Sequence, residues 1–486
     1  MAQAQKAQTD GSAWRGHRFF FRVSGFSVPC PLGDNGRPTE GRATNHPPPS
    51  RDTPLAEGVR PIEVWAWAMY DFANSGYTTV VITAVFNAYF VAVVAQRAPW
   101  ATLSWTVALS LSYAMIVVTA PLVGAVADAL AAKKKLLALT TAGCVLFTAL
   151  LYFAGPGSLW LAAACIVASN FFFGSGENLI AAFLPELAGS RAMGRVSGWG
   201  WSLGYLGGLA SLGACLLWIG RAEAQGRSAA EAVPETMLLT AALFAAASLP
   251  TFALLRERAK PAPQARGIGR AAWVRLAATF RHARRFRDLS RFLACSLFYQ
   301  AGIQAVITLA AIYAQEAMHF TTRETLRLVL AVNVTAALGA FSFGYVQDRI
   351  GPVRAIALTL CGWIAMVLIA ALARGPAAFW FAANLAGLCM GASQSGGRAL
   401  VGLLAPASRL GEFFGLWGLA VKLASILGPL TYGLATWLSG GDHRLAILVT
   451  GSYFVIGLVL LGGVDMVRGR RAALRAARED RLRRRP

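Results

Sequence analysis

Long apolar runs separated by short polar segments dominate the chain from about residue 62 onward. A window of about 20 apolar residues spans the hydrocarbon core of a bilayer, and such windows recur along the sequence. We expect spans at 64–96, 101–127, 136–154, 158–181, 196–219, 236–255, 292–316, 325–346, 354–373, 376–402, 412–437 and 444–465. The pattern therefore predicts an all-α integral membrane protein with twelve transmembrane helices.

Composition supports a membrane protein and argues against other classes. Hydrophobic residues make up 56% and charged residues 14% of the 486 positions, whereas soluble domains contain about 25% charged residues. The formal net charge is +22, but the basic residues collect in connecting segments, so we expect no nucleic-acid partner. The sequence contains no P-loop, no paired metal-ligand spacing and no nucleophile with a paired histidine. We therefore predict neither an enzyme nor a bound cofactor or metal.

The distribution of lysine and arginine predicts the topology, because basic residues gather in cytoplasmic loops. It places both termini in the cytoplasm, and the Ala-, Arg- and Gly-rich usage suggests a bacterial inner membrane. The predicted domains are a disordered tail (1–61), a six-helix bundle (62–255), a basic linker (256–291), a second six-helix bundle (292–466) and a basic tail (467–486).

The predicted linker contains a basic amphipathic stretch with Trp273, Ala277 and Phe280 on one face. Such a face is suited to anionic lipids of the inner leaflet. A solvated linker helix is the alternative.

Two short motifs repeat at corresponding places in the two halves. Gly124 and Asp128 end the second span in "GAVAD", and Gly344, Asp348 and Arg349 end the eighth in "GYVQDR". Glycine permits close helix approach, and the aspartate can accept hydrogen bonds from a facing helix N-terminus or an arginine. We expect these residues to latch the inner side shut and to release it during transport.

A second repeated motif supports the same division. "GRVSGWGWSLGYLGG" opens the fifth span and "GEFFGLWGLAVKLASILG" the eleventh, so that Gly194 corresponds to Gly411 and Gly198 to Gly415. Two parallel six-span halves around a central cavity describe a transporter. Gly200, Gly204 and Gly208 form a smooth face for helix packing, while Trp65 and Trp67 are expected to anchor the first span at the membrane interface.

Three longer strings resemble the vacuole-effluxer branch of the major facilitator superfamily. They are "WAMYDFANSGYTTVVITAVFNAYF", "FLPELAGSRAMGRVSGWGWSLGYLGG" and "GASQSGGRALVGLLAPASRLGEFFGLWGLAVKLASILGPLTYG". The resemblance covers roughly residues 62–466 and implies a twelve-helix transporter, with amino-acid efflux as the expected activity. In the superfamily an arginine usually follows the motif aspartate. Ala129 stands there in the first copy, and Lys133 and Lys134 are expected to keep the positive charge.

Four charged residues lie inside predicted spans, where a central charge costs about 2.5–3.5 kcal/mol on insertion scales. They are Asp71, Glu177, Arg398 and Lys422, two acids and two bases that can neutralise one another. Helical spacing places further polar residues beside them or on neighbouring spans. These candidate substrate or coupling residues are Asn74, Asn178, Gln300, Gln304 and Gln394.

Depth along the helices separates two roles. Lys422 lies about 15 Å into its span at 1.5 Å per residue, near the midplane, which favours contact with substrate over a static helix pair. Asp71, Glu177 and Arg398 lie nearer the inner ends, where they form either an inner gate or direct ligands.

The charges suggest a small zwitterionic substrate, most simply an amino acid. Its carboxylate would meet Lys422 or Arg398, and its ammonium an acid or the Gln300/Gln304 pair, while Asp71 or Glu177 carries a coupled proton. Two alternatives remain open at this point: efflux of unrelated drugs or metabolites, and a membrane sensor without transport activity.

Overall fold

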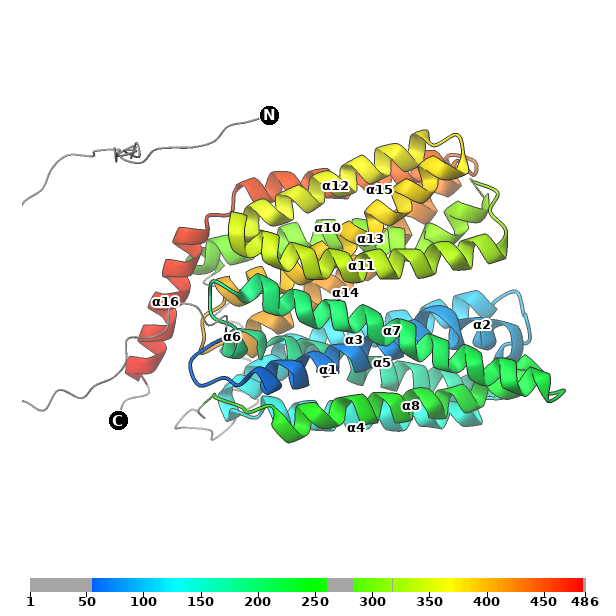
Figure 1. Cartoon of the computed structure of the whole chain (residues 1–486), viewed down its shortest axis with the longest axis horizontal. Helices are drawn as coiled ribbons and strands as arrows, with labels where there is room; N and C mark the ends of the chain where they lie inside the picture. Colours follow the sequence, from blue (N-terminus) through cyan, green and yellow to red (C-terminus); the bar gives the residue numbers. More distant parts are fainter. Residues whose placement is uncertain (1–54, 260–282, 317, 484–486) are drawn as a thin grey trace, which may run out of the picture. The chain divides into compact units, whose positions relative to one another are not determined.

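The computed structural model describes residues 55–259, 283–316 and 318–483. Most of the predicted N-terminal tail and the amphipathic stretch at Trp273, Ala277 and Phe280 lie outside the described residues. We call the helices up to α8 the N-terminal half and α10 to α15 the C-terminal half (Figure 1).

The N-terminal half is built from six long helical segments. The first runs through α1 (Pro61–Tyr77), η1 (Thr78–Ala84), α2 (Phe86–Tyr89) and η2 (Phe90–Val94). The others are α3 (Ala101–Leu130), α4 (Lys133–Leu150) with η3 (Leu151–Phe153), α5 (Leu159–Ala181), α7 (Met193–Ala224) and α8 (Ala229–Leu254), with the short α6 (Leu184–Leu187) before α7.

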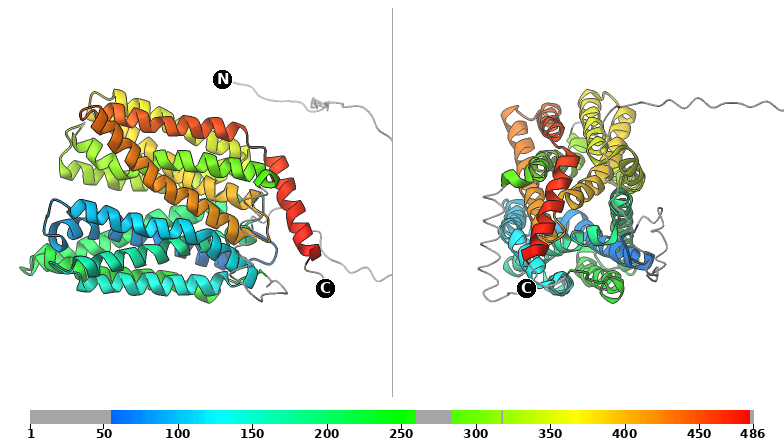
Figure 2. Two further views of the ribbon diagram at one scale, coloured as in Figure 1. Left: turned by 180° about the vertical axis from the view of Figure 1, so that it is seen from behind. Right: turned by 90° about the vertical axis from the view of Figure 1, so that its left-hand side faces the viewer.

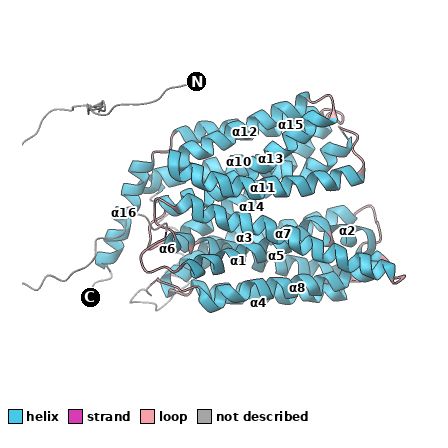
Figure 3. Ribbon diagram, in the orientation of Figure 1, coloured by secondary structure: helices cyan, strands magenta, loops and turns pink. Residues whose placement is uncertain are grey.

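The C-terminal half repeats this arrangement. After η4 (Ala283–Phe286) it contains α10 (Arg287–Glu316), α11 (Thr322–Ile350), α12 (Pro352–Leu372), α13 (Pro376–Leu404), α14 (Leu410–Leu438) and α15 (His443–Gly462). A further helix, α16 (Met466–Arg483), follows. The described part of the chain is helical apart from loops and one isolated bridge between Leu55 and Ala188 (Figure 3). The residues predicted as a basic tail are therefore largely helical.

Ten of the described helical segments are long and apolar enough to cross a membrane. The two remaining long helices, α10 and α13, lie within the C-terminal half beside the others (Figure 1). Both carry buried polar residues within the span, Gln300 on α10 and Gln394 and Arg398 on α13. Such residues lower the mean hydropathy of a span without preventing it from packing inside a bundle.

Each half has its own apolar core. In the N-terminal half, Trp67, Tyr70 and Phe86 are almost fully buried. In the C-terminal half, Trp363 stacks on Phe454 with ring centroids 5.0 Å apart. Because each half packs around its own large side chains, the halves can act as two bodies joined along a separate interface.

The first and last helices of each half are joined by the same type of ion pair. Glu63, in the first turn of α1, accepts a 2.8 Å hydrogen bond from Arg258, just beyond α8. Asp288, in the first turn of α10, accepts bonds of 2.8 and 2.6 Å from Arg468, beyond α15. We call the end of the bundle where α1 begins and α15 ends the terminal end. These pairs tie each half together there.

Replacing Glu63 by glutamine is expected to destabilise the N-terminal half. Glu63 is buried, and a hydrogen bond to a charged group contributes about 1.5–3 kcal/mol. Because Arg258 is 27% exposed, we expect the lower part of that range. The measurement is the heat-induced loss of folded protein in detergent. Glu57→Gln, at an exposed position, is the control. Equal melting temperatures of Glu63→Gln and Glu57→Gln would show that the Glu63–Arg258 pair does not stabilise the N-terminal half.

The lysines predicted to lend positive charge to the first latch have another partner. Lys133 is buried, and its ammonium pairs with Glu186. The backbone amides of Lys133 and Lys134 donate to the Glu257 carboxylate at 2.8 and 3.1 Å. The prediction for Lys133 was wrong, because Glu186 of the same half neutralises its charge, whereas the Lys134 ammonium donates to the Leu255 carbonyl oxygen at 2.7 Å.

Candidate functional site

The two predicted latches join the halves at the terminal end. Asp128, near the end of α3, accepts hydrogen bonds of 3.0 Å from the backbone amides of Gly411 and Glu412, in the first turn of α14. Exposed amides at a helix N-terminus favour a negative charge. Asp128 therefore caps a helix of the opposite half.

The second latch has the same geometry. Asp348, near the end of α11, accepts from the amides of Gly194 and Arg195 at 2.9 and 3.2 Å, in the first turn of α7. The Arg195 side chain adds a third bond of 2.9 Å. Arg349, predicted to belong to this motif, is exposed. Both aspartates bind the N-terminus of a facing helix, as predicted. The arginine that binds Asp348 is Arg195 of that facing helix and not Arg349.

The motif glycines allow the helices to approach this closely. A Cβ at Gly124 would lie 2.0 Å from the Gly411 carbonyl oxygen, and one at Gly344 would lie 2.8 Å from the Gly194 carbonyl oxygen. Both neighbours are backbone atoms, which cannot turn away as a side chain would. Each latch thus consists of a glycine contact and a capping aspartate on the same helix.

Substituting Gly124 by alanine is expected to open the α3–α14 contact. Overpacking of this kind costs about 1–3 kcal/mol, which shifts the ratio of closed to open molecules by roughly 5- to 150-fold. Maleimide labelling of Ser175→Cys, a position buried beside the latch, measures the opening once Cys30 and Cys361 are replaced by serine.

Gly213→Ala is the matched control for this variant, because a Cβ there meets nothing within 4 Å. Equal labelling rates in the Gly124→Ala and Gly213→Ala backgrounds would show that the glycine contact does not hold the latch.

A buried ion pair on two other helices, α13 and α1, also crosses between the halves. The Arg398 guanidinium on α13 donates to Asp71 on α1 at 2.7 Å, and to the side chain and carbonyl of Ser197 on α7 at 3.1 and 2.9 Å. The two side chains of the pair are 3% and 10% exposed. Arg398 is therefore held by two helices of the opposite half.

Aromatic rings complete the surroundings of Arg398. Its guanidinium carbon lies 4.6 Å from the ring of Trp67 and 5.4 Å from that of Trp201. Trp67 is fully buried, so the prediction that it anchors the first span at the interface was wrong, whereas Trp65 is 47% exposed. The rings exclude water from the pair and add cation–π attraction.

The glycine face on α7 makes room for this pair. A Cβ at Gly200 would lie 2.4 Å from an Asp71 carboxylate oxygen and 2.7 Å from an Arg398 nitrogen. Gly204 and Gly208 similarly face Ser75 and Thr79 of the first helical segment. The predicted packing role of these glycines is confirmed.

The second ion pair also crosses between the halves but is more open. The Lys422 ammonium on α14 lies 3.2 Å from the Glu177 carboxylate on α5. The glutamate side chain is 29% exposed. The ammonium also lies 5.5 and 5.6 Å from the ring centroids of Tyr113 and Phe173. A solute that reaches Glu177 thus meets a carboxylate, an ammonium and two aromatic faces.

The predicted grouping of the four charges needs one correction. Sequence depth placed Glu177 with Asp71 and Arg398, but Glu177 pairs with Lys422. Lys422 lies about 16 Å along α14 from Gly411, whereas Gly200, beside the Asp71–Arg398 pair, lies about 9 Å along α7 from Gly194. The two pairs therefore occupy different levels above the latches, and the long lysine side chain can reach the end of α5.

The remaining predicted polar residues lie close to these pairs. Gln300 on α10 donates a 2.9 Å hydrogen bond to Gln394, one turn before Arg398 on α13. Gln304 lies one turn further along α10 and is partly buried. Asn74 is one turn from Asp71, and Asn178 follows Glu177 in the sequence.

Several buried polar atoms around the pairs lack a hydrogen-bond partner within the described residues. They are Asn74 Oδ1, Asn178 Nδ2, Trp201 Nε1, Gln300 Oε1 and Trp417 Nε1. A buried polar group without a partner costs about 1–3 kcal/mol. Both donors and acceptors are available, which favours a polar ligand at this interface.

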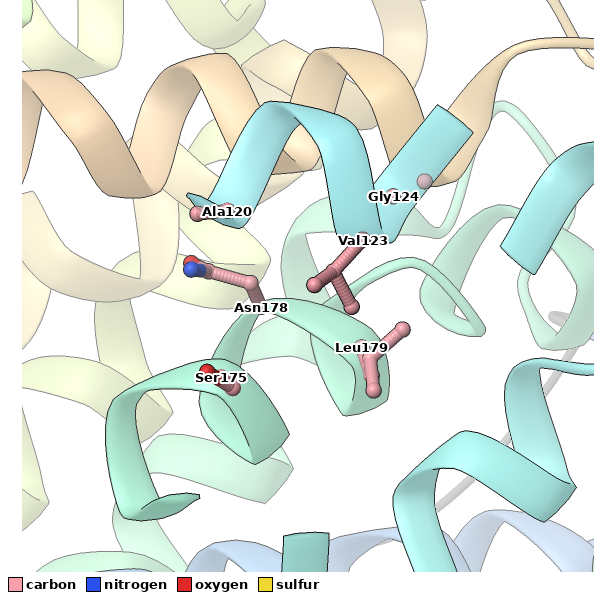
Figure 4. Close-up of a pocket in the computed structure, with 7 residues that line it drawn as sticks. Ala120, Val123, Gly124, Ser175, Asn178 and Leu179 are labelled. Atoms are coloured by element: carbon pink, nitrogen blue, oxygen red, sulfur yellow. The ribbon is translucent and has the colours of Figure 1, made fainter. Parts of the chain in front are cut away.

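Asn178 also lines a small enclosed pocket next to the first latch. The pocket lies between α3, α5 and the start of α14, and Figure 4 shows the amide of Asn178 directed toward Ala120. A Cβ at Gly418 would lie 2.0 Å from the Asn178 amide oxygen. Asn178 therefore fills the interface between the halves, where it packs against Gly418, one turn from Lys422 on α14.

Sequence reasoning missed several residues that shape the site. Arg195, Ser197, Tyr113 and Phe173 all contact a predicted charge. Tyr113 and Phe173 do not stand out among apolar neighbours, and Arg195 is visible as a loop charge without any sign of its partner. Ser197 carries a usable signal, since it lies three residues from Gly194 and Gly200 in the repeated glycine motif.

Solved structures with similar folds are membrane transporters. The human organic anion transporter MFSD10 (TETRAN) matches with a TM-score of 0.62 and 17% identity, covering 82% of this chain and 98% of that one. The transporter FucP in its outward conformation matches with a TM-score of 0.63 and 15% identity, covering 83% and 98%. These matches show the twelve-helix major facilitator fold.

Comparison with other protein sequences identifies the family more narrowly than comparison of folds does. An uncharacterized MFS-type transporter, YxiO of Bacillus subtilis, is 27% identical over 409 residues, covering 82% of this chain and 94% of that protein. Autophagy-related protein 22 of Kluyveromyces lactis is 36% identical over 94 residues, covering 19% and 18%. The profile of the family described as "Vacuole effluxer Atg22 like" matches residues 90–474. The chain therefore belongs to the vacuole effluxer Atg22-like family of multi-pass, MFS-type membrane transporters.

Proposed function

We propose that this protein exports amino acids by alternating access and that Lys422 and Glu177 bind the substrate. The observation that carries this proposal is the Lys422–Glu177 pair, in which opposite charges from the two halves lie 3.2 Å apart and the acid is partly exposed. An amino acid carries both an ammonium and a carboxylate. Its carboxylate can pair with Lys422 in place of Glu177, and its ammonium can pair with Glu177 in place of Lys422.

The substrate needs both of its charges to replace the Lys422–Glu177 ion pair. A substrate carboxylate that takes Lys422 alone would leave the partly buried Glu177 without its cation, which is costly. A zwitterion satisfies both groups at once. The rings of Tyr113 and Phe173, which flank the lysine ammonium, can equally accept a substrate ammonium.

The Asp71–Arg398 pair is suited to a gate. It is more buried than the Lys422–Glu177 pair, and Arg398 already donates to two helices of the opposite half. Separating the halves at the terminal end breaks this pair together with both latches. We assign Asp71 and Arg398 to the gate and Lys422 and Glu177 to the substrate.

The basic loops favour a cytoplasmic terminal end and a bacterial inner membrane. The latches and the Asp71–Arg398 pair then close the cytoplasmic side, and the opposite side is the one from which an exported substrate leaves.

Energy for export would come from a proton gradient through Glu177. Partial exposure lets this carboxylate exchange protons with water, while its bond to Lys422 ties its charge to substrate binding. We expect Glu177→Gln to lose gradient-driven transport while retaining counterflow above background, and Asp71→Asn to keep gradient dependence. Measuring uptake into vesicles with and without an imposed pH gradient tests this. Undiminished dependence in Glu177→Gln would remove proton coupling through that residue.

Counterflow in liposomes tests the substrate class directly. Purified protein is reconstituted with a high internal concentration of mixed amino acids, and exchange for each labelled amino acid is measured. This design needs no coupling ion. Exchange of a subset of amino acids supports the proposal, whereas no exchange of any by folded protein would overturn it.

A further inference from the structure

Helix α16 lies across the terminal end of the molecule (Figure 2). It begins four residues after α15 ends, and its small residues Gly469, Ala473 and Ala476 are buried. A Cβ at Gly469 would lie 2.6 Å from the Leu404 side chain, at the end of α13. A face of small side chains thus lets α16 lie flat against the C-terminal half.

Bidentate ion pairs pin both ends of this helix. At its start, Arg468 binds both oxygens of Asp288. Near its end, Asp480 accepts two 3.1 Å bonds from Arg409 and a 2.6 Å bond from the Ser408 hydroxyl. The Arg409 and Asp480 side chains are only 18% and 17% exposed. Bidentate, mostly buried ion pairs of this kind are stronger than ordinary surface ion pairs.

Arg409 lies directly before the α14 residues that form the first latch. It immediately precedes α14, whose next amides, those of Gly411 and Glu412, hold Asp128 of the opposite half. Burial acts to lower the pKa of Arg409, but the bonds and charge of Asp480, with attraction from Glu412 and Asp128, raise it overall. The arginine therefore contributes positive potential where the negative latch residue docks.

We propose that α16 is a brace for the closed terminal end and that Asp480 is its key positioning residue. By holding Ser408 and Arg409, Asp480 keeps the loop between α13 and α14 in the conformation that presents the helix N-terminus to Asp128. Release of α16 loosens that loop and favours opening of the terminal end. The inference rests on the proposed latch but is independent of the substrate.

A neighbouring residue provides a matched control. Glu479 also pairs with an arginine, Arg285, but both side chains are well exposed, at 50% and 40%. Glu479 contacts Arg285 of η4, whereas Asp480 contacts the loop that carries Arg409. Glu479→Gln removes the same charge from the same helix and leaves the contacts of Asp480 with Ser408 and Arg409 in place.

Spin labels at Lys135 and Ile350 report on opening, because both positions are exposed and lie near the terminal end of opposite halves. Pulsed electron–electron distance measurements without substrate would compare the parent, Asp480→Asn, Glu479→Gln and Asp128→Asn proteins. We expect the ratio of open to closed distances to rise about tenfold in Asp480→Asn and to stay unchanged in Glu479→Gln.

The outcomes separate the brace from the proposed latch. Opening in Asp128→Asn but not in Asp480→Asn would overturn the brace and leave the latch standing. No opening in either would overturn both. Equal opening in Asp480→Asn and Glu479→Gln would overturn the specific role of Asp480.

Discussion

Replacing Lys422 by methionine is expected to reduce amino-acid counterflow by at least about 30-fold. The methionine keeps most of the side-chain volume but loses the ammonium that the proposed substrate carboxylate meets. Truncating one member of a buried, hydrogen-bonded charge pair costs about 2–5 kcal/mol, which corresponds to roughly 30- to several-thousand-fold. The initial rate of exchange in liposomes, per folded transporter, is the measurement.

A neutral double variant distinguishes substrate binding from a static helix pair. In Lys422→Met/Glu177→Gln no charge is left without its partner, so a merely structural pair would regain transport. A pair that binds the substrate would not, because both complementary charges are gone. Lys135→Met, at an exposed lysine, controls for loss of positive charge. Near-normal exchange in the double variant would refute the substrate role.

Replacing Arg398 by alanine is expected to destabilise the protein by about 3–5 kcal/mol. The change leaves Asp71 buried without its cation, and breaking a buried pair by removing one partner has costs of that size. It also removes the guanidinium that fills the space between Trp67 and Trp201. Loss of monodisperse protein after heating in detergent measures the effect, with the exposed Arg354→Ala as control.

The neutral double variant Asp71→Asn/Arg398→Gln should recover much of that stability, because replacing both members of a buried pair is often close to neutral. It should still open the terminal end more readily than the parent. Instability equal to that of Arg398→Ala would show that packing, and not the unpaired charge, causes the loss.

The sequence alone was sufficient for the fold and for the places where the glycines and aspartates of the two motifs meet the opposite half, but it assigned Arg349 to the second motif, where Arg195 binds instead. Twelve apolar windows predict twelve helices, and ten described segments pass the test of length and hydropathy while α10 and α13 complete the set. Gly124 with Asp128, and Gly344 with Asp348, lie where the repeated motifs place them, at the terminal end of α3 and α11. These features could be read because they depend on local composition and on spacing along one helix.

The partner of each of these buried side chains was decided by the tertiary structure. Glu177 binds Lys422 and not Arg398, Lys133 binds Glu186, and Trp67 covers Arg398 instead of facing the membrane interface. Depth along a helix is a single coordinate, whereas partner choice also depends on which helix faces which and on its rotation.

Helix α16 shows the same division between sequence and structure. Its arginines and its position after the last span were visible in the sequence, which predicted only a basic tail. The position of α16 against the bundle depends on partners far away in the chain. They are Asp288 at one end of the helix, and Ser408 and Arg409 at the other. The sequence determined that this is a two-bundle membrane transporter with four charges in its spans. Only the packed structure decided which charges meet, because long-range contacts depend on the mutual orientation of helices that local patterns do not specify.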